Sequence, residues 1–364
     1  MARIGVRIGI NALYLIPGGV GGTEIYLREL LAALAELDQS NEYLVFTNLE
    51  TQPDLVPKQA NFHWKPQAVH ARFRPARILW EQIVLPFEAA RYGLDVLFNP
   101  GFTAPLFSPC RQVTVFHDLQ HKRHPEYFRW FDLPFWRLML WAAAHRSRRL
   151  IAVSEATRSD LLRFYSIRKD RIAVIHHGVG PAFAQLDRSH TESYLLCVST
   201  LHPHKNLPRL IRAYGRKKRD FQLILAGLRG FHAQAIERLV QELNLRDSVR
   251  ITGWVPREEL YSLYARARAF VYPSTFEGFG MPVLEAMAAG IPVACSDIPP
   301  LREVAGDTAL YFDPLNEDAI EAGLERVMSD GQLQERMTQE RRERAQPFTW
   351  ERSAAQTLKV LCDI

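Results

Sequence analysis

Two glutamates, Glu277 and Glu285, flank a glycine-rich loop. Between them, the backbone amides of Phe279, Gly280 and Met281 precede a predicted helix, where free N–H groups and the helix dipole favour phosphate. Carboxylates accept hydrogen bonds from vicinal hydroxyls, so the two acids suit two sugar rings on either side of a diphosphate. Taken alone, either acid could equally be an ordinary glutamate in a first helical turn.

The elements that must position this loop can be predicted from the residues around it. Residues 269–272 are apolar and predict a buried strand, and residues 283–289 predict a helix. Pro282 suits the first helical position, because its missing N–H would be unpaired there. Gly290 suits the C-terminal cap, and Pro292 prevents the helix from continuing. We therefore expect a strand, a glycine loop and a helix in succession.

Lys205 follows a predicted strand at residues 194–198 and is a candidate cation for the same diphosphate. Its flexible ammonium can neutralise a leaving phosphate as a point charge, although a solvated lysine is the simpler alternative. No Asp-x-Asp cluster is present, so we expect Lys205 and helix-start amides to hold the phosphates without a metal or other cofactor.

A second glycine-rich loop, residues 17–24, separates a predicted first strand at residues 7–13 from a predicted helix at residues 25–37. Gly21 and Gly22 would let the backbone approach a ligand closely, although a merely flexible turn is the alternative. The loop lacks the G-x-G-x-x-G spacing, and the next strand ends in Thr47 and Asn48 rather than an acid. Both features argue against a nicotinamide dinucleotide site.

His117 and Asp118 follow a predicted strand at residues 113–116. Ligands of open α/β sheets gather beyond the carboxyl ends of strands, and a lone histidine is otherwise more often structural. The neighbouring acid could orient the ring or raise its basicity. We therefore expect His117 to belong to a site.

Aromatic residues alternate with arginines over residues 127–149. This pattern suits a membrane interface, a helix packed in the first domain or a partner surface. The helical spacing of Leu138 and Trp141 favours the packed helix, and Pro134 argues against one uninterrupted helix. Earlier in the chain, a helix that begins at residue 77 is predicted to stop around Pro86.

Length and composition limit the remaining possibilities. The 364 residues, 47% of them hydrophobic, suit two domains, with a polar linker expected at residues 183–193 and a charged helix at residues 332–344. The net charge of +5 comes from basic residues that are spread rather than striped, and no RNA-binding aromatic motif is present, so nucleic acid is not expected as a partner. The four dispersed cysteines argue against zinc or redox sites. The charged residues at the start argue against a signal peptide, and no apolar run of 18 residues is present, so we expect no membrane-spanning helix.

The loop with its two acids resembles the E-x7-E motif of retaining glycosyltransferases of family 4. The resemblance implies the GT-B fold: two Rossmann-like α/β domains that face each other across a cleft. Residues 1–185 would bind the acceptor, residues 190–346 the nucleotide sugar, and residues 347–364 would form a helix that returns to the first domain. Gly180 stands where the family commonly has an acid, and Ser199-Thr200 stand where it often has Gly-Arg, so a second phosphate cation is missing from its usual place. His202, His204 or Arg209 could supply that cation, and their spacing does not decide which.

The resemblance also implies roles for individual residues. Glu285 would contact the nucleotide ribose, Glu277 the donor sugar, and His117 the transferred sugar. Asp118 would support His117 or lie near the acceptor, and Trp254 would border the base unless it is a core residue. The implied catalytic residues are His117, Lys205 and Glu277. The implied donor-binding residues are Gly21, Gly22, Thr200, Lys205, Trp254, Glu277, Gly278, Phe279, Gly280, Met281 and Glu285.

Residues 77–82, His117-Asp118 and residues 200–206 look like bacterial mannosyltransferases of surface-polysaccharide assembly, including lipopolysaccharide. The expected reaction is a retaining transfer of mannose from GDP-mannose to a hydroxyl of a glycan or lipid-linked acceptor. A glucosyl or N-acetylglucosaminyl transfer from a UDP- or ADP-sugar is an alternative, as is a related phosphorylase or synthase. We expect a cytoplasmic protein, with peripheral membrane contact through residues 127–149.

Overall fold

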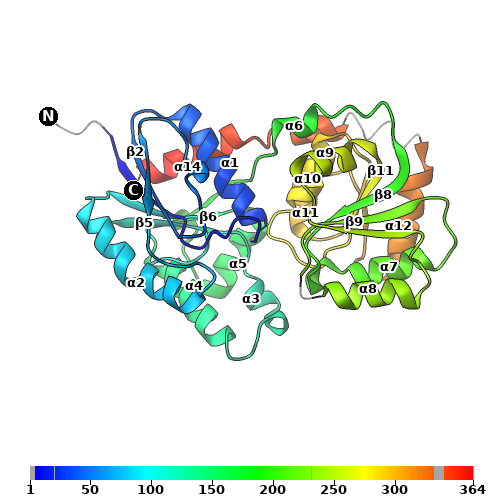
Figure 1. The fold of residues 1–364 in the computed structure, drawn as a ribbon, viewed down its shortest axis with the longest axis horizontal. Coiled ribbons are helices and arrows are strands. Elements are labelled where there is room, and N and C mark those ends of the chain that lie inside the picture. The colour runs from blue at the N-terminus through cyan, green and yellow to red at the C-terminus, as the bar shows by residue number, and fades with distance from the viewer. Residues whose placement is uncertain (1–4, 20, 231, 332–339, 364) are drawn as a thin grey trace. The chain divides into compact units, whose positions relative to one another are not determined.

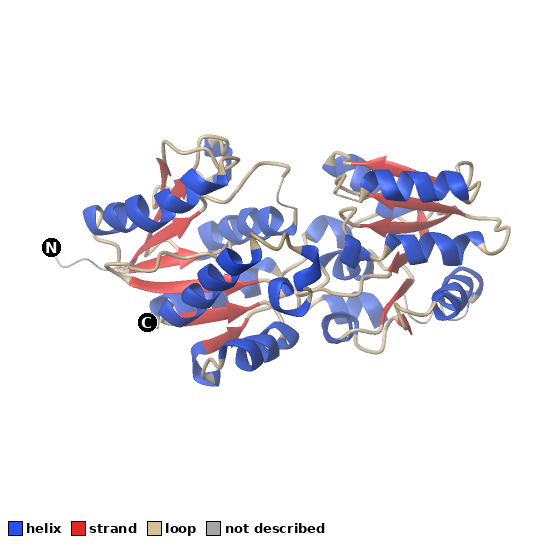
Figure 2. Ribbon diagram, turned by 90° about the horizontal axis from the view of Figure 1, so that it is seen from below, coloured by secondary structure: helices blue, strands red, loops and turns tan. Residues whose placement is uncertain are grey.

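The computed structural model describes residues 5–19, 21–230, 232–331 and 340–363. The chain divides into two compact units (Figure 1). Unit 1 comprises Met1–Gly178 and Thr349–Ile364, and unit 2 comprises Val179–Phe348. Each unit is a parallel sheet flanked by helices, which confirms the predicted pair of α/β domains (Figure 2).

The sheet of unit 1 has seven parallel strands in the order β3-β2-β1-β4-β5-β6-β7. The strands are β1 (Arg7–Asn11), β2 (Glu42–Thr47), β3 (Phe62–Pro66), β4 (Val96–Asn99), β5 (Arg111–Phe116), β6 (Arg149–Ala152) and β7 (Ile172–Val174). The helices are α1 (Gly22–Leu37), α2 (Arg74–Arg91), α3 (Gln120–Arg123), α4 (Leu133–Arg146), α5 (Glu155–Tyr165) and α14 (Trp350–Cys362). Short 3-10 turns are η1 (Pro53–Leu55), η2 (Pro125–Tyr127) and η3 (Lys169–Arg171).

Strand register shows which helices share a face of this sheet. Leu97 lies opposite Gln112, and Thr114 lies opposite Leu150, so side chains at these positions point to the same face. Leu97 belongs to the core under α2, and Leu150 belongs to the core under α4 and α5. These three helices therefore cover one face, while α1 packs with α14 on the other (Figure 1).

The sheet of unit 2 has six parallel strands in the order β10-β9-β8-β11-β12-β13. The strands are β8 (Glu192–Val198), β9 (Gln222–Ala226), β10 (Val249–Gly253), β11 (Ala267–Tyr272), β12 (Val293–Ser296) and β13 (Leu310–Phe312). The helices are α6 (Pro181–Ala184), α7 (Leu207–Gly215), α8 (Ala233–Glu242), α9 (Arg257–Arg266), α10 (Met281–Ala288), α11 (Pro299–Ala305) and α12 (Glu317–Ser329). A 3-10 turn, η4 (Pro203–Lys205), links β8 to α7.

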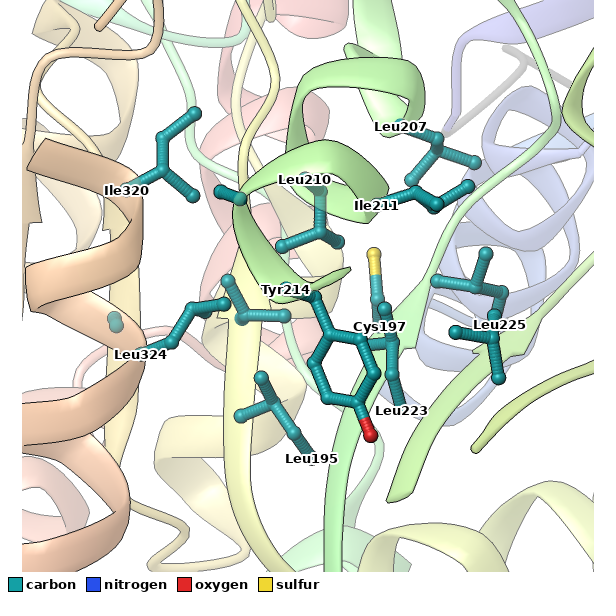
Figure 3. Packing of buried hydrophobic residues seen from close by; sticks show 14 of the residues in the cluster. Leu195, Cys197, Leu207, Leu210, Ile211, Tyr214, Leu223, Leu225, Ile320 and Leu324 are labelled. Carbon is teal, nitrogen blue, oxygen red and sulfur yellow. The ribbon is translucent and has the colours of Figure 1, made fainter. Parts of the chain in front are cut away.

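The core of unit 2 anchors β8 and the turn that follows it (Figure 3). α7 buries Leu207, Leu210, Ile211 and Tyr214, which recur at the spacing of one helical face. They pack against Leu195 and Cys197 of β8, Leu223 and Leu225 of β9, and Ile320 and Leu324 of α12. Because α7 begins directly after η4, this packing fixes the position of Lys205 at the end of the turn.

Two predictions about elements are wrong. α2 does not stop at Pro86 but continues to Arg91. A proline removes one backbone hydrogen bond from a helix, and the fully buried Leu85 and Ala89 on either side favour continuation through their packing. The stretch at residues 183–193 is not a free linker, because the buried Phe183 packs edge-on against Tyr261 at 5.0 Å.

Other expectations held at the level of elements. Pro134 lies in the first turn of α4, so residues 127–141 are not one helix, as predicted. The chain ends in α14, which packs on α1 in unit 1. Of the helix predicted at residues 332–344, residues 332–339 lie outside the described residues.

Candidate active site

Unit 2 places its candidate site where the strand order reverses. β8 lies between β9 and β11, and the chain winds outward from β8 and β11 in opposite directions. Ligands of open α/β sheets bind outside the carboxyl ends of strands at such a switch point. The loop after β8 carries Lys205 and the loop after β11 carries Glu277, so residues from two separate motifs meet there.

Lys205 and Glu277 form an ion pair in which the ammonium Nζ lies 2.6 Å from Oε1. The same ammonium donates to the Tyr272 hydroxyl at 2.9 Å. Only 13% of the Lys205 side chain and 11% of the Glu277 side chain are exposed. The sequence assigned these residues to a phosphate and a sugar separately, and it did not indicate that they contact each other.

The protonation of this cluster follows from its contacts. Burial raises the pKa of Glu277, but Lys205, helped by His204 and Ser274, outweighs burial and brings the pKa below its ordinary value. Burial, followed by the charge of Glu277, holds the pKa of Tyr272 well above its ordinary value. At neutral pH Glu277 is therefore a carboxylate, and Tyr272 keeps its proton.

Hydrogen bonds hold the loop after β8 against the loop after β11. Asn206 adopts a left-handed backbone with φ of 58°. Its Nδ2 donates to the carbonyl oxygens of Pro273 at 3.1 Å and Pro314 at 2.7 Å. The amide of Thr275 donates to the carbonyl oxygen of His204 at 2.8 Å. These bonds connect the segments on both sides of the ion pair and restrict its geometry.

The start of α10 has the geometry expected of a phosphate site. Gly280 caps the helix with φ of 107°, and a Cβ there would lie 2.4 Å from a methyl carbon of Leu301. Met281 is the first helical residue, so Pro282 occupies the second position rather than the predicted first. The amides of Gly280 and Met281 lie before the first intrahelical hydrogen bond of α10. Their N–H groups and the positive end of the helix dipole therefore face the loop.

The other residues between the two acids differ in their surroundings. Phe279 is buried, and its ring packs against Phe348 at 6.0 Å. Gly278 is partly exposed. The candidate donor-binding groups of residues 278–281 are therefore backbone atoms, while the Phe279 side chain anchors the loop.

Glu285 lies in the second turn of α10 and is almost fully buried. One of its carboxylate oxygens accepts a hydrogen bond from the Tyr264 hydroxyl at 2.7 Å. Burial, followed by the charge of Glu285, keeps the pKa of Tyr264 well above its ordinary value. Each predicted acid thus has a buried tyrosine as a partner, and no sequence pattern marked Tyr264 or Tyr272 for this role.

The loops after β9 and β10 border the same edge of the sheet. Gly227 approaches the loop after β8 so closely that a Cβ would lie 2.2 Å from the Ser199 carbonyl oxygen. Thr200 follows in that loop and is half-buried. Trp254 follows β10 and is 63% exposed, so the alternative that it is a core residue is wrong.

The candidates for a second phosphate cation now differ in charge. Burial, followed by Lys205, lowers the pKa of His202, so this ring is neutral at pH 7. The rings of His202 and His204 stack at 5.9 Å. Arg209 lies in the first turn of α7 and donates to Asn206 Oδ1 at 2.9 Å. An arginine keeps its charge throughout the working pH range, which makes Arg209 the stronger candidate.

Unit 1 has its own switch point, between β1 and β4. His117 lies at the carboxyl end of β5, beside this point, and is buried. Its Nε2 lies 2.8 Å from the Pro100 carbonyl oxygen. Because a carbonyl can only accept, Nε2 carries the proton and Nδ1 of the neutral ring is an acceptor.

Rings from three other segments surround His117. Tyr26 of α1 meets it edge-on at 4.9 Å, Phe102 lies 5.1 Å away, and His177 stacks at 5.4 Å. Phe102 has φ of 71°, a costly value for a non-glycine residue that often marks a functional segment. The sequence pattern did not single out these three residues.

The expectation that a neighbouring acid raises the basicity of His117 is wrong. Burial lowers the pKa of His117 to about 4. The Asp118 carboxylate accepts from the Gln120 amide at 2.8 Å, at the start of α3. The Pro100 carbonyl, rather than a carboxylate, sets the tautomer of the ring.

The glycine loop of unit 1 ends in the cap of α1. Gly21 is the cap residue with φ of 60°, and Gly22 is the first helical residue. The amide of Gly18 donates to Glu24 Oε2 at 2.8 Å, which ties the loop to the first turn of the helix. Residue 20 lies outside the described residues.

Glu81 and Gln82 of α2 hold the loop that carries Pro100. Glu81 is buried and accepts from Asn11 Nδ2 at 3.2 Å and from the Thr103 hydroxyl at 2.8 Å. Gln82 donates to the Ala104 carbonyl at 3.1 Å and accepts from the amide that follows Pro105 at 2.9 Å. The motif at residues 77–82 therefore includes a clamp on the loop after β4.

The segment at residues 127–149 both packs and presents apolar side chains. The buried residues of α4 are Met139, Leu140 and Ala142–Ala144. Leu138 and Trp141, on which the packed-helix interpretation rested, are 55% and 48% exposed, so that part of the interpretation is wrong. Both a core face and an exposed aromatic face are present.

The described residues contain neither a cluster of metal ligands nor a membrane-spanning helix. Among them, no three His, Cys, Asp or Glu side chains converge as metal ligands. None of the described helices combines the length and the apolar character needed to cross a bilayer. The four cysteines are not in disulfides.

Two family models match consecutive parts of the chain. The model described as "Glycosyltransferase Family 4" matches residues 20–183, and the one described as "Glycosyl transferases group 1" matches residues 181–344. The chain is 34% identical to the O-antigen chain mannosyltransferase B of Escherichia coli over 366 residues. That match spans 94% of this chain and 95% of the relative.

Solved structures of the same architecture confirm the fold. Sucrose-phosphate synthase from Thermosynechococcus elongatus superposes with a TM-score of 0.78 over 98% of both chains at 23% identity. Anabaena HepE in complex with UDP and glucose gives a TM-score of 0.77 over 99% of this chain and 100% of that one, at 19% identity. At such low identity these two likenesses support the GT-B fold alone.

Proposed function

The chain belongs to the family 4 glycosyltransferases, and from this premise we propose that it transfers mannose from GDP-mannose to a hydroxyl of a glycan or lipid-linked acceptor with retention of anomeric configuration. It is a hexosyltransferase by family. Mannose is favoured because the Escherichia coli relative, similar over nearly the whole chain, is an O-antigen chain mannosyltransferase.

The observation that carries the proposal is the Lys205–Glu277 pair at the switch point of unit 2. A diphosphate at the start of α10 would meet the ammonium that Glu277 and Tyr272 hold at the carboxyl edge of the same sheet. Phosphate oxygens would replace Glu277 as the partner of Lys205. The released carboxylate would then accept hydrogen bonds from the hydroxyls of the donor sugar.

Catalysis would consist mainly of positioning and of stabilising the charge on the leaving diphosphate. Lys205 and the amides of Gly280 and Met281 would stabilise that charge, and Glu285 would hold the ribose. The acceptor hydroxyl would attack from the face that the diphosphate leaves, with a phosphate oxygen taking its proton. An NMR spectrum of the product tests this: the donor's α-configuration should persist, and a β-linked product would overturn the retaining mechanism.

His117 would contact the transferred sugar as a neutral hydrogen-bonding group. Its Nδ1 can accept a hydroxyl hydrogen, because the Pro100 carbonyl holds the ring proton on Nε2. With a pKa of about 4, the ring would not serve as an acid at neutral pH. Trp254, exposed after β10, would border the base.

A thermal-shift panel of GDP, UDP, ADP and their sugars tests the donor. Binding to the folded state raises the melting temperature, and a ligand at 100 times its Kd adds about 2.7 kcal/mol of stability. We expect the largest shift with GDP-mannose. A larger shift with UDP-sugars would favour the glucosyl or N-acetylglucosaminyl alternative, and sugar phosphate formed from inorganic phosphate would favour a phosphorylase.

We further propose that the reaction requires no metal, because Lys205 and helix-start amides can balance the diphosphate. Turnover after treatment with EDTA should equal turnover with added magnesium. A strict requirement for magnesium would contradict this part of the proposal. Contact with a membrane through residues 127–149 completes the proposal, since a lipid-linked acceptor would be presented at such a surface.

A further inference from the structure

A cavity of about 610 Å³ lies in unit 1 at the amino-terminal ends of β5, β6 and β7. Five arginines line it: Arg111, Arg146, Arg148, Arg168 and Arg171. None of its lining residues, all of them in the described part of the chain, is acidic. The cavity therefore offers a concentrated positive charge to an anion.

This cavity is separate from the candidate active site of unit 1. Arg111 begins β5, whereas His117 follows the end of the same strand. A six-residue strand spans about 20 Å, so the cavity and the histidine lie at opposite edges of the sheet. Sugar transfer at the carboxyl edge leaves the arginine cavity without an assigned role.

The five arginines differ in the partners that their guanidinium groups already have. Arg171 donates to the carbonyl oxygens of Ala144 and His145 at the end of α4. Arg168 pairs with the exposed Asp170 at 3.1 Å. Within the described residues, neither Arg111 nor Arg148 has a carboxylate partner. Arg146 likewise has no carboxylate partner among the described residues, so these three side chains keep their charge for a ligand.

An exposed apolar surface adjoins the cavity. Leu79, Ile83 and Phe87 recur every fourth residue along α2 and are 60–68% exposed. On α4, Leu138 and Trp141 are exposed on the side away from the buried Met139 and Leu140. Eleven of the eighteen exposed large apolar side chains of the described chain fall within residues 73–141: Phe73, Leu79, Ile83, Phe87, Phe107, Tyr127, Trp130, Phe131, Phe135, Leu138 and Trp141.

Side-chain contacts join the apolar surface to the cavity. Arg146 lies over the ring of the exposed Phe107, and both residues line the cavity. The loop that carries Phe107 is hydrogen-bonded to Gln82 of α2 through its neighbour Leu106. At the other end of α2, Arg74 stacks on Trp136 of α4 at 4.0 Å. The register places α2 and α4 on the same face of the sheet, so the surface is continuous with the cavity.

The net charge is concentrated in the same part of the chain. Residues 71–150 contain twelve arginines and lysines but six aspartates and glutamates, a net charge of +6. The whole chain has a net charge of +5, so the remainder is slightly negative. The net positive charge of the chain therefore falls within this segment.

We propose that this surface docks on a membrane of anionic phospholipid, with the apolar side chains of α2 and α4 in the headgroup region and a lipid phosphate in the arginine cavity. Aromatic and leucine side chains gain free energy by burial at the headgroup boundary, and each nearby arginine adds attraction to anionic lipid. Nucleic acid would use the arginines, but it would leave the rows of Leu, Ile and Phe exposed. The proposal deepens the peripheral contact proposed above and does not depend on which sugar is transferred.

Co-sedimentation of the full chain with vesicles tests the proposal. The full chain should bind vesicles of phosphatidylglycerol and phosphatidylcholine, and bind phosphatidylcholine alone far more weakly. The double variant Arg111→Gln with Arg148→Gln should lower the vesicle–water partition coefficient of the protein about 30-fold. This follows because each arginine near an anionic surface contributes roughly 1 kcal/mol to binding. Arg246→Gln with Arg250→Gln, exposed positions in unit 2, is the matched control and should change nothing.

The apolar part is tested by Leu138→Gln with Trp141→Gln, which should also release the protein, whereas Leu243→Gln in unit 2 should not. Equal binding to both vesicle types, or full binding by the Arg111/Arg148 variant, would overturn the proposal. So would strong binding to random duplex DNA with no vesicle binding. Transfer to a water-soluble acceptor separates this proposal from the proposed function, because all these variants should retain it.

Discussion

Lys205 and Glu277 bring opposite charges to a place where water reaches little of either side chain. A buried ion pair adds little net stability, but removing one partner leaves an uncompensated charge. Here that sensitivity coincides with the proposed reaction, since the donor would have to take the place of one partner. The same residues should therefore affect both stability and turnover, and the two effects can be separated.

Lys205→Met should destabilise the protein by about 3–5 kcal/mol, because it strands the Glu277 carboxylate. It should also lower kcat/KM by roughly 100- to 1,000-fold through loss of charge stabilisation at the leaving diphosphate. Adding Glu277→Gln should restore most of the stability without restoring activity. Urea unfolding and a transfer assay measure the two effects, with Lys218→Met, an exposed lysine, as the control. Normal turnover by Lys205→Met would remove Lys205 from the site.

His117 predicts a pH dependence of stability. Its pKa is about 4 in the folded chain and has an ordinary value of 6.5, so between these values the unfolded state binds the proton and the folded state does not. Stability should therefore fall as pH falls from about 6.5 to 4, by up to about 3 kcal/mol from this residue. His117→Asn should flatten the curve measured by urea unfolding, and His70→Asn, at an exposed position, should not. Parallel curves for the His117 variant and the parent would contradict this assignment.

At the scale of elements, α2 acts as a clamp as well as a cover for the sheet. Glu81 and Gln82 hold the loop after β4, and that loop supplies the carbonyl that fixes the His117 tautomer. The route from α2 to His117 thus passes through the backbone at Pro100. Glu81 is a positioning residue in this account, since it touches the loop rather than a substrate.

Glu81→Ala should leave the Thr103 hydroxyl and the Asn11 amide without their acceptor, at about 1–3 kcal/mol for each buried group. Because the loop then loosens, KM for the acceptor should rise more than kcat falls. Glu81→Gln should recover part of both effects, and Glu88→Ala, farther along α2, is the control. Steady-state kinetics and urea unfolding give these values. An unchanged KM in a destabilised Glu81→Ala protein would limit Glu81 to a structural role.

At the scale of the whole molecule, the chain completes its first unit with its last helix. α14 packs on α1, and its Trp350 is buried. A Cβ on Gly178 would lie 2.2 Å from the Trp350 amide nitrogen. The last residue of the first segment of unit 1 is therefore in close contact with the first residue of α14. Unit 1 therefore cannot be complete until α14 has been made.

Trp350→Ala should cost about 3–5 kcal/mol, the usual loss for a buried tryptophan, and the loss should fall on unit 1. Hydrogen exchange followed by mass spectrometry should show faster exchange in α1 and β1 and no change in β8 or β11. Trp254→Ala, at an exposed position, is the control for stability. Equal acceleration in both units would show that they unfold together.

Much of the fold and part of the candidate site could be predicted from local patterns. Apolar runs, glycine loops and capping residues are properties of neighbouring positions, so the strands and the loops that follow them could be read directly. Because the carboxyl ends of parallel strands share one edge, His117, Lys205 and the residue 277–285 loop could be assigned to sites. The family resemblance added the roles, most of which await the measurements above.

What only the tertiary structure decided are contacts between distant positions. Lys205 and Glu277 are separated by 72 positions, and Glu81 and Asn11 by 70, yet each pair is in direct contact. Strand order and helix packing set such contacts, and the spacing of residues within one motif carries no information about either. The tyrosine partners of the two acids and the continuation of α2 past Pro86 were missed for the same reason. The amino-acid sequence by itself determined which residues can do the chemistry, and the packing of the sheets decided which of them contact one another.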